Sequence, residues 1–98
     1  MIDLKYRSYH FALTTIRKIN RLKLPITARP LSDQLIRSST SVGANVIEGR
    51  SGSSRKDLVR FYQIALKSAN ESKYWLCLLR DAFDLKENEI EYLIKEAD

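Results

Sequence analysis

The sequence predicts an all-α protein, an up-down-up-down antiparallel four-helix bundle whose fourth helix is short or truncated. Its three glycines lie between positions 43 and 52, and its prolines are Pro25 and Pro30. Between these breakers, apolar residues recur every three or four positions, which is the period of a helix. Short connections favour antiparallel neighbours. Because no repeat or long linker divides the 98 residues, we expect one domain over residues 1–98.

The first helix should present an apolar side that starts at Tyr9 and contains Ala12, Leu13, Ile16 and Ile19. It should end near Lys23, because Pro25 cannot continue it. Pro30 suits the first turn of a second helix. The inward face of that helix is predicted to hold Leu31, Leu35, Ser38, Val42, Val46 and Gly49, before a turn at residues 50–53.

Ser54 and Asp57 resemble a capping box, with Asp in place of Glu, at the start of a long third helix over about residues 55–83. One face of this helix carries Leu58, Phe61, Tyr62, Ala65, Ala69, Leu76, Leu79 and Phe83. A second stripe contains Ile64, Trp75, Leu78 and Ala82. It either packs on the first or fourth helix of the same chain or forms a protein interface centred on Trp75. A fourth helix from about residue 87 contains Ile90, Leu93, Ile94 and Ala97.

The composition excludes several classes of site. A lone Cys77 cannot form an internal disulfide, and His10 is the only histidine. No window approaches the roughly 18 apolar residues of a membrane span. We therefore expect a cytoplasmic protein without a metal or other cofactor.

The charge is unevenly distributed. The chain carries a net charge of +5. Residues 1–30 contain seven Lys or Arg and one acidic residue, whereas residues 68–98 contain four Lys or Arg and eight acidic residues. Along the first helix, a basic stripe holds Arg7, His10, Thr14, Arg17, Lys18 and Arg21, all on the side opposite Ala12 and Ile16. Such a stripe could follow the phosphates of RNA or DNA, or it could be an ordinary solvated face.

A second basic group lies around the predicted turn and contains Arg50, Arg55, Lys56 and Arg60. The free N–H groups at the start of the third helix would add to it as an anion site. The alternative is a charged hairpin tip. The Gly and Lys spacing is not that of a nucleotide-binding phosphate loop, so we assign no ATP binding.

The second helix is unusually rich in small residues. Small side chains let a neighbouring backbone approach closely. One side of the helix carries Arg37, Ser41, Ala44 and Glu48, so that two small residues lie between a charged residue at each end. This pattern predicts a tight helix–helix contact, and a pocket using Asn45 and Glu48 is the alternative. No positioned base accompanies the serines and no acid pair is suitably spaced, so we predict no catalytic residues.

The segments that start at residues 41, 53 and 64 together resemble a known family. They read Ser41-Val42-Gly43-Ala44-Asn45-Val46-Ile47-Glu48-Gly49-Arg50, then Ser53 to Phe61, then Ile64-Ala65-Leu66-Lys67-Ser68-Ala69-Asn70-Glu71. The pattern resembles the four-helix-bundle proteins encoded by intervening sequences of bacterial 23S ribosomal RNA genes. It is similar, more distantly, to the accessory variability proteins of diversity-generating retroelements.

The resemblance implies a ring-like homopentamer without known catalysis. In the retroelement relatives, a basic ring binds nucleic acid and the element's reverse transcriptase. The family pattern carries over to Asn45, Glu48, Gly49 and Glu71 as packing or interface positions. Family members usually extend the fourth helix further than this sequence does.

Together these patterns predict a non-catalytic, homo-oligomeric nucleic-acid-binding module that could also dock a reverse transcriptase. The alternative is a purely structural, self-assembling protein in which the basic front of one copy meets the acidic rear of another.

Overall fold

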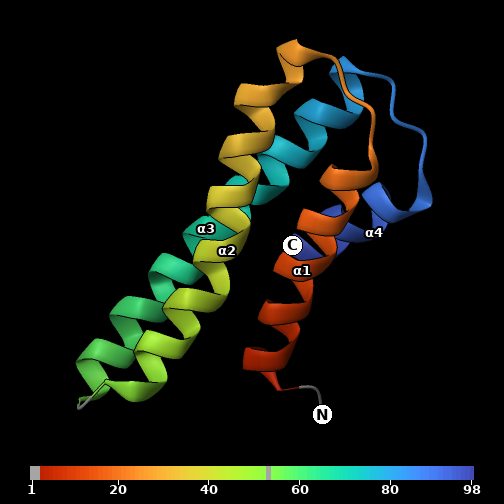
Figure 1. The fold of residues 1–98 in the computed structure, drawn as a ribbon. Coiled ribbons are helices and arrows are strands. Elements are labelled where there is room, and N and C mark those ends of the chain that lie inside the picture. Colours follow the sequence, from red (N-terminus) through yellow and green to blue (C-terminus); the bar gives the residue numbers. More distant parts are fainter. Residues whose placement is uncertain (1–2, 53) are drawn as a thin grey trace.

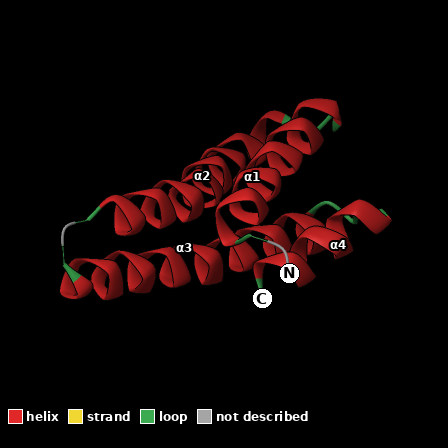
Figure 2. Ribbon diagram, turned by 90° about the horizontal axis from the view of Figure 1, so that it is seen from below, coloured by secondary structure: helices red, strands yellow, loops and turns green. Residues whose placement is uncertain are grey.

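The computed structural model describes residues 3–52 and 54–98, and it confirms an antiparallel bundle of four α-helices. These are α1 (Leu4–Arg21), α2 (Arg29–Ser51), α3 (Arg55–Ala82) and α4 (Asn88–Ala97), and a short 3-10 helix, η1 (Ile26–Ala28), precedes α2. Successive helices alternate in direction (Figure 1). Seen from below, α1 lies beside α2 and α4 beside α3 (Figure 2).

Local signals fix the helix ends close to where the sequence predicts them. The Ser54 side chain accepts a hydrogen bond from the Asp57 backbone N–H at 3.1 Å, which confirms the predicted cap of α3. Pro30 lies in the first turn of α2. The first helix begins earlier than Tyr9, because Asp3 caps α1 by accepting a hydrogen bond from the Lys5 N–H at 3.2 Å.

The two longest helices, α2 and α3, pack against each other as an antiparallel hairpin. Buried hydroxyl groups line the contact between them, which we call the seam. The Ser72 Oγ, which is fully buried, lies 2.9 Å from the Ser38 Oγ and 2.9 Å from the Ser68 carbonyl oxygen. One turn away, the Ser68 and Ser41 hydroxyls are 2.9 Å apart. These small side chains let the two helices approach closely while their polar groups stay paired. The small residues at positions 38 and 41 thus form a tight contact inside the chain.

The apolar core is concentrated at one end of the bundle. Its fully buried side chains come from three helices: Leu35, Leu76, Leu79, Ile90 and Leu93. The ten residues of α4 cover only this end, and the C-terminus lies about halfway along α1 in Figure 1. Beyond it, a groove of about 210 Å³ opens between α1, α2 and α3, lined by Phe11, Val46, Tyr62 and Leu66 among others. Glu96 and Ala97 of α4 also line this groove.

The predicted inward face of α1 is wrong in part: Ile19 packs against the core, but Tyr9 and Ile16 do not. The buried residues of this helix are Ser8, Phe11, Thr15 and Lys18, whereas Tyr9 is 65% exposed and Ile16 is 39% exposed. The helix is rotated relative to our prediction because Phe11 joins the core cluster and α4 packs against the same side. Tyr9 and Ile16 consequently lie at the surface.

No helix in the described part of the chain is long and apolar enough to cross a membrane.

Candidate nucleic-acid interface

The basic stripe of α1 is largely neutralised by acids that α4 brings to it. The guanidinium of Arg7 donates to both carboxylate oxygens of Glu96, at 3.0 and 3.1 Å. Arg21 lies 3.9 Å from Glu89. Within residues 3–52 and 54–98, Arg17 is the one Lys or Arg of the stripe that forms no ion pair. The stripe is therefore not a continuous track of free cations.

Lys18 departs furthest from the predicted phosphate-contacting role. Its side chain is only 10% exposed, and its Nζ lies 2.9 Å from Glu87 and 3.6 Å from Glu89. Glu87 is the residue that precedes the first turn of α4. Lys18 thus connects α1 to the start of α4, and its ammonium group is occupied inside the protein. The expectation that Lys18 offers its charge to a phosphate is corrected by this contact.

Arg50 also has internal partners. Its guanidinium contacts the Asp3 carboxylate at 2.8 Å and donates from Nε to the Tyr62 hydroxyl at 3.2 Å. The hydrogen bond from Arg50, together with that from the Lys5 backbone N–H, lowers the pKa of Asp3 below its ordinary value of 3.8. Arg50 therefore ties the end of α2 to the beginning of α1 and to α3.

The remaining members of the second basic group lie together at the start of α3. Arg55, Lys56 and Arg60 are exposed, and with Val59 and Gln63 they line a shallow hollow of about 580 Å³. None of these three cations forms an ion pair among the described residues. We call Arg55, Lys56 and Arg60 the α3 basic group. Its guanidinium and ammonium groups are available to a partner, although the Arg60 guanidinium also lies 4.8 Å from the centre of the Phe61 ring.

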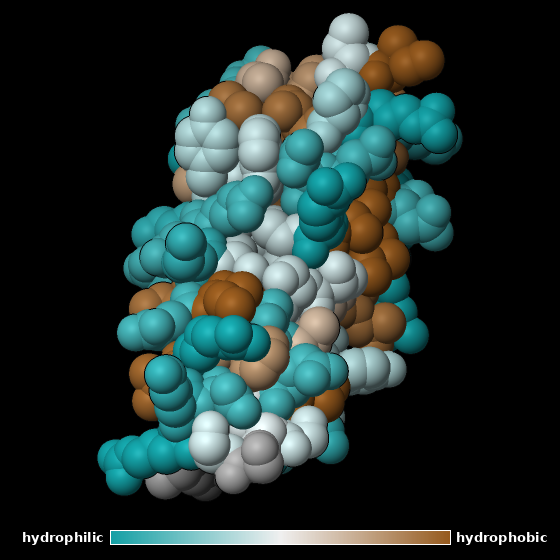
Figure 3. Space-filling view, turned by 90° about the vertical axis from the view of Figure 1, so that its left-hand side faces the viewer, coloured by the Kyte–Doolittle hydropathy of each residue, from teal (hydrophilic) through white to brown (hydrophobic). Residues whose placement is uncertain are grey.

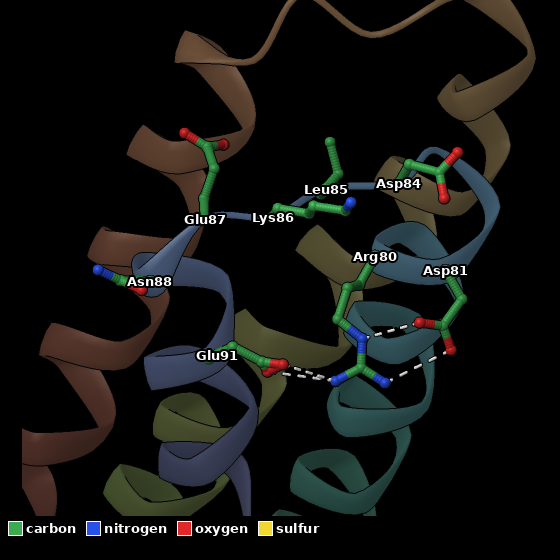
Figure 4. A pocket seen from close by; sticks show the side chains of 8 residues that line it. All are labelled: Arg80, Asp81, Asp84, Leu85, Lys86, Glu87, Asn88 and Glu91. Carbon is green, nitrogen blue, oxygen red and sulfur yellow. Dashed lines mark hydrogen bonds and ion pairs between the residues drawn. The ribbon is translucent and has the colours of Figure 1, made fainter.

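The other end of α3 is acidic. Figure 4 shows Arg80 between Asp81 on α3 and Glu91 on α4, with Asp84 and Glu87 on the loop between the two helices. Arg80 donates to Asp81 at 2.8 Å and to Glu91 at 2.8 Å. These contacts raise the pKa of Arg80 and lower that of Asp81. In the described residues, no group of three or more His, Cys, Asp or Glu side chains could hold a metal ion.

The predicted interface residues of α2 divide into two sets. Asn45 is half-buried and donates from Nδ2 to the carbonyl and the hydroxyl of Ser41 in its own helix, at 2.8 and 2.9 Å, and Gly49 is buried against Tyr62 of α3. In contrast, Arg37, Ala44 and Glu48 are exposed. The first set packs the hairpin, and the second remains available to another molecule.

The second stripe of α3 is also divided. Trp75 and Leu78 are half-buried, and Trp75 packs against the chain's own core and makes an edge contact with Tyr74, with ring centres 5.0 Å apart. Ile64 is 38% exposed, and Glu71 is exposed. Trp75 therefore has packing partners within its own chain.

Sequence reasoning missed an apolar groove between α1 and α2. It has a volume of about 590 Å³ and is lined by Tyr6, Tyr9, Gly43, Ala44 and Ile47, among others. Tyr6 and Tyr9 are separated by three positions, so they share a side of α1, and this spacing was the available signal. The rotation of α1 described above is what places both rings at the surface.

The fold and the surface define a small four-helix-bundle protein with an acidic end, a basic group at the opposite end of α3 and two open grooves. The sequence matches the family described as 23S rRNA-intervening sequence protein over residues 2–98, and the chain belongs to that family. A solved structure of a protein of unknown function from the S23 ribosomal protein family of Bacteroides thetaiotaomicron VPI-5482 is similar, with a TM-score of 0.82 and 32% sequence identity. The match covers 97% of this chain and 88% of that one. No curated protein matches the sequence.

Proposed function

We propose that this protein is a non-catalytic, homo-oligomeric module that binds RNA or DNA through the α3 basic group. The observation that supports it is the set of three exposed cations without acidic partners among the described residues, gathered around one hollow. They lie at the first turns of α3, where the helix dipole and free backbone N–H groups also attract phosphate. Recognition through phosphates alone implies binding with little dependence on nucleotide sequence.

Self-association would gather several such groups on one particle. A single bundle carries the α3 basic group at one end, while the exposed Arg17 and Arg21 lie toward the other end of a molecule about 45 Å long. The resemblance to the accessory variability proteins supports a ring of five copies, with a reverse transcriptase as a further partner. Several weak phosphate-binding groups on one assembly would bind a nucleic acid more tightly than a single group does.

Fluorescence anisotropy with a labelled single-stranded RNA tests the proposal. Three phosphate contacts predict an affinity loss of about 20-fold between 50 and 200 mM salt. Replacing Arg55 and Arg60 with Glu should reduce binding at least tenfold, because repulsion replaces attraction at the hollow. The matched control is the double variant Lys67→Glu/Lys95→Glu, which reverses the same number of charges at exposed positions outside the hollow.

Equal losses for the hollow variant and the control would contradict a specific basic site, and so would salt-independent binding. In that case a purely structural, self-assembling protein is the second candidate. The observation that favours it is the pairing of the α1 cations with acids of α4, which shows that much of the positive charge is used inside the fold.

A further inference from the structure

The groove between α1 and α2 holds two exposed tyrosine rings. Tyr6 is 62% exposed and Tyr9 is 65% exposed, and both line this groove of about 590 Å³. The α2 side of the groove consists of Gly43, Ala44 and Ile47, which leave an open apolar surface opposite the rings. We call this space the tyrosine groove. Its volume is within the range of ligand pockets, which is roughly 300–1,000 Å³.

The polar side chains that line the tyrosine groove differ in their availability. The Thr40 hydroxyl donates to the Ile36 carbonyl of its own helix at 2.8 Å. The Asp3 carboxylate is neutralised by the Arg50 guanidinium at 2.8 Å. In contrast, Lys5 is exposed and forms no ion pair among residues 3–52 and 54–98. The groove therefore offers flat apolar faces beside an available positive charge.

The same side of α1 continues this pattern beyond the groove. His10 lies one turn after Tyr6 and stacks on it, with ring centres 6.1 Å apart and an interplanar angle of 27°. Arg17 lies eleven residues after Tyr6, which is three turns, or about 16 Å, along the same side. Arg17 is exposed and, within the described part of the chain, has no acidic partner. Because α1 contains no Asp or Glu, its exposed rings and cations follow one another without an acid of the same helix between them.

This arrangement is complementary to a single strand of nucleic acid. Unpaired bases stack on aromatic side chains, and nearby cations bind the phosphates that link the bases. A duplex keeps its bases stacked on one another, so they are not available to the two rings. The hairpin has a different surface: viewed from the side of α2 and α3, near-neutral residues form a pale strip between teal charged ones (Figure 3).

We propose that the tyrosine groove binds unpaired bases of a single-stranded nucleic acid. The bases stack on Tyr6 and Tyr9, while Lys5 and Arg17 contact the flanking phosphates. The apolar α2 side and the occupied Thr40 hydroxyl leave little means of reading base edges, so the preference among the four bases is small. This inference rests in part on the proposed function, because it names the form of nucleic acid that the protein binds.

Fluorescence anisotropy with two labelled DNA strands of about 12 nucleotides tests the stacking, one with all its bases and one abasic strand with the same number of phosphates. The wild type should bind the abasic strand about tenfold more weakly, because the rings have nothing to stack on. Tyr6→Leu/Tyr9→Leu should weaken binding to the strand with bases about tenfold and leave binding to the abasic strand and to a duplex unchanged. Tyr6→Phe/Tyr9→Phe keeps the rings and should retain wild-type affinity within about twofold.

The matched control is Tyr74→Leu/Tyr92→Leu, which removes two exposed rings outside the groove and should leave binding unchanged. Leucine is a good helix former, so circular dichroism should show unchanged helicity in both leucine variants. An RNA strand of the same sequence is measured in parallel. A loss for Tyr6→Leu/Tyr9→Leu on either the DNA or the RNA strand supports the site, and a loss on neither overturns it.

Two further results would overturn the proposal. One is equal affinity of the wild type for the abasic strand and the strand with bases. The other is a change in the sedimentation of Tyr6→Leu/Tyr9→Leu without nucleic acid, which would assign the groove to a contact between copies of the chain.

These outcomes are separable from failure of the proposed function. If Arg55→Glu/Arg60→Glu weakens binding to both strands while the tyrosine variant binds normally, only the tyrosine groove is rejected. If the tyrosine variant loses affinity for the strand with bases while Arg55→Glu/Arg60→Glu binds normally, only the role of the α3 basic group is rejected.

Discussion

Lys18 is the most buried charged residue among the described positions that carry an ion pair. A lysine can occupy such a position because its aliphatic stem packs along the core while its ammonium group reaches partners at the edge. Here the partners come from Glu87 and Glu89, at the beginning of α4. Lys18 contacts the Oε1 atom of Glu87, whereas the buried Oε2 atom has no hydrogen-bond partner among the described residues. The pair therefore fixes the position at which α4 begins.

Replacing Lys18 with Gln should destabilise the protein by about 1–2 kcal/mol, because it leaves Glu87 without its cation. The value lies below that for a fully buried pair, since the Glu87 side chain is 43% exposed. Urea denaturation followed by circular dichroism measures the loss.

The control for this substitution is Arg17→Gln at the neighbouring exposed position, where we expect a change within about 0.5 kcal/mol. Equal losses for both variants would mean that the ion pair with α4 contributes nothing measurable.

At the level of the helices, the close packing of α2 depends on where its glycines lie. A Cβ at Gly49 would be 3.1 Å from two atoms of the Tyr62 ring and 3.2 Å from the Phe61 Cβ, so α3 would have to move. A Cβ at Gly43 would make only an ordinary contact, at 3.4 Å from the Ser8 Cβ. Both glycines belong to α2, but only at Gly49 does the neighbouring helix α3 lie too close for a Cβ atom.

This difference predicts opposite effects of the same substitution. Gly43→Ala should stabilise the protein by about 0.5–1 kcal/mol, because alanine is the better helix former. Gly49→Ala gains the same propensity but must displace Tyr62 and Phe61, so we expect a net loss of about 1 kcal/mol. Thermal or urea unfolding of the two variants side by side measures both changes. A stabilised Gly49→Ala variant would show that the hairpin can open slightly at no cost.

At the level of the whole molecule, stability should be unevenly distributed. The α2–α3 hairpin is long and has its polar groups paired along the seam, whereas α4 has ten residues and is tied to its neighbours partly by surface ion pairs. Such pairs contribute little individually and are weakened by salt.

We therefore predict lower hydrogen-exchange protection for the backbone amides of α4 than for those in the middle of α2 and α3. The difference should increase in high salt, as the contacts of Arg7, Lys73 and Arg80 with acids weaken. Amide exchange measured by NMR or mass spectrometry at low and high salt tests this. Uniform protection across all four helices would mean that the bundle opens only as one unit.

The sequence determined the number of helices, most of their ends and the inward face of α2. Caps and prolines act over a few residues, so Ser54, Pro25 and Pro30 could be interpreted without knowledge of the fold. The same holds for Leu35, Val46 and Gly49, because the apolar period of α2 agrees with its burial.

Only the tertiary structure decided the rotation of α1 and the availability of its charges. Counting apolar residues favoured the side with Tyr9 and Ile16, but the side that carries Phe11 joins the core, together with Thr15 and Lys18. Which side of a helix is buried depends on the neighbours that cover it. Here the segment that covers α1 and supplies its counter-charges is α4 with the preceding Glu87, which begins more than 60 residues further along the chain. A charge pattern along one helix cannot reveal acids that folding brings from another.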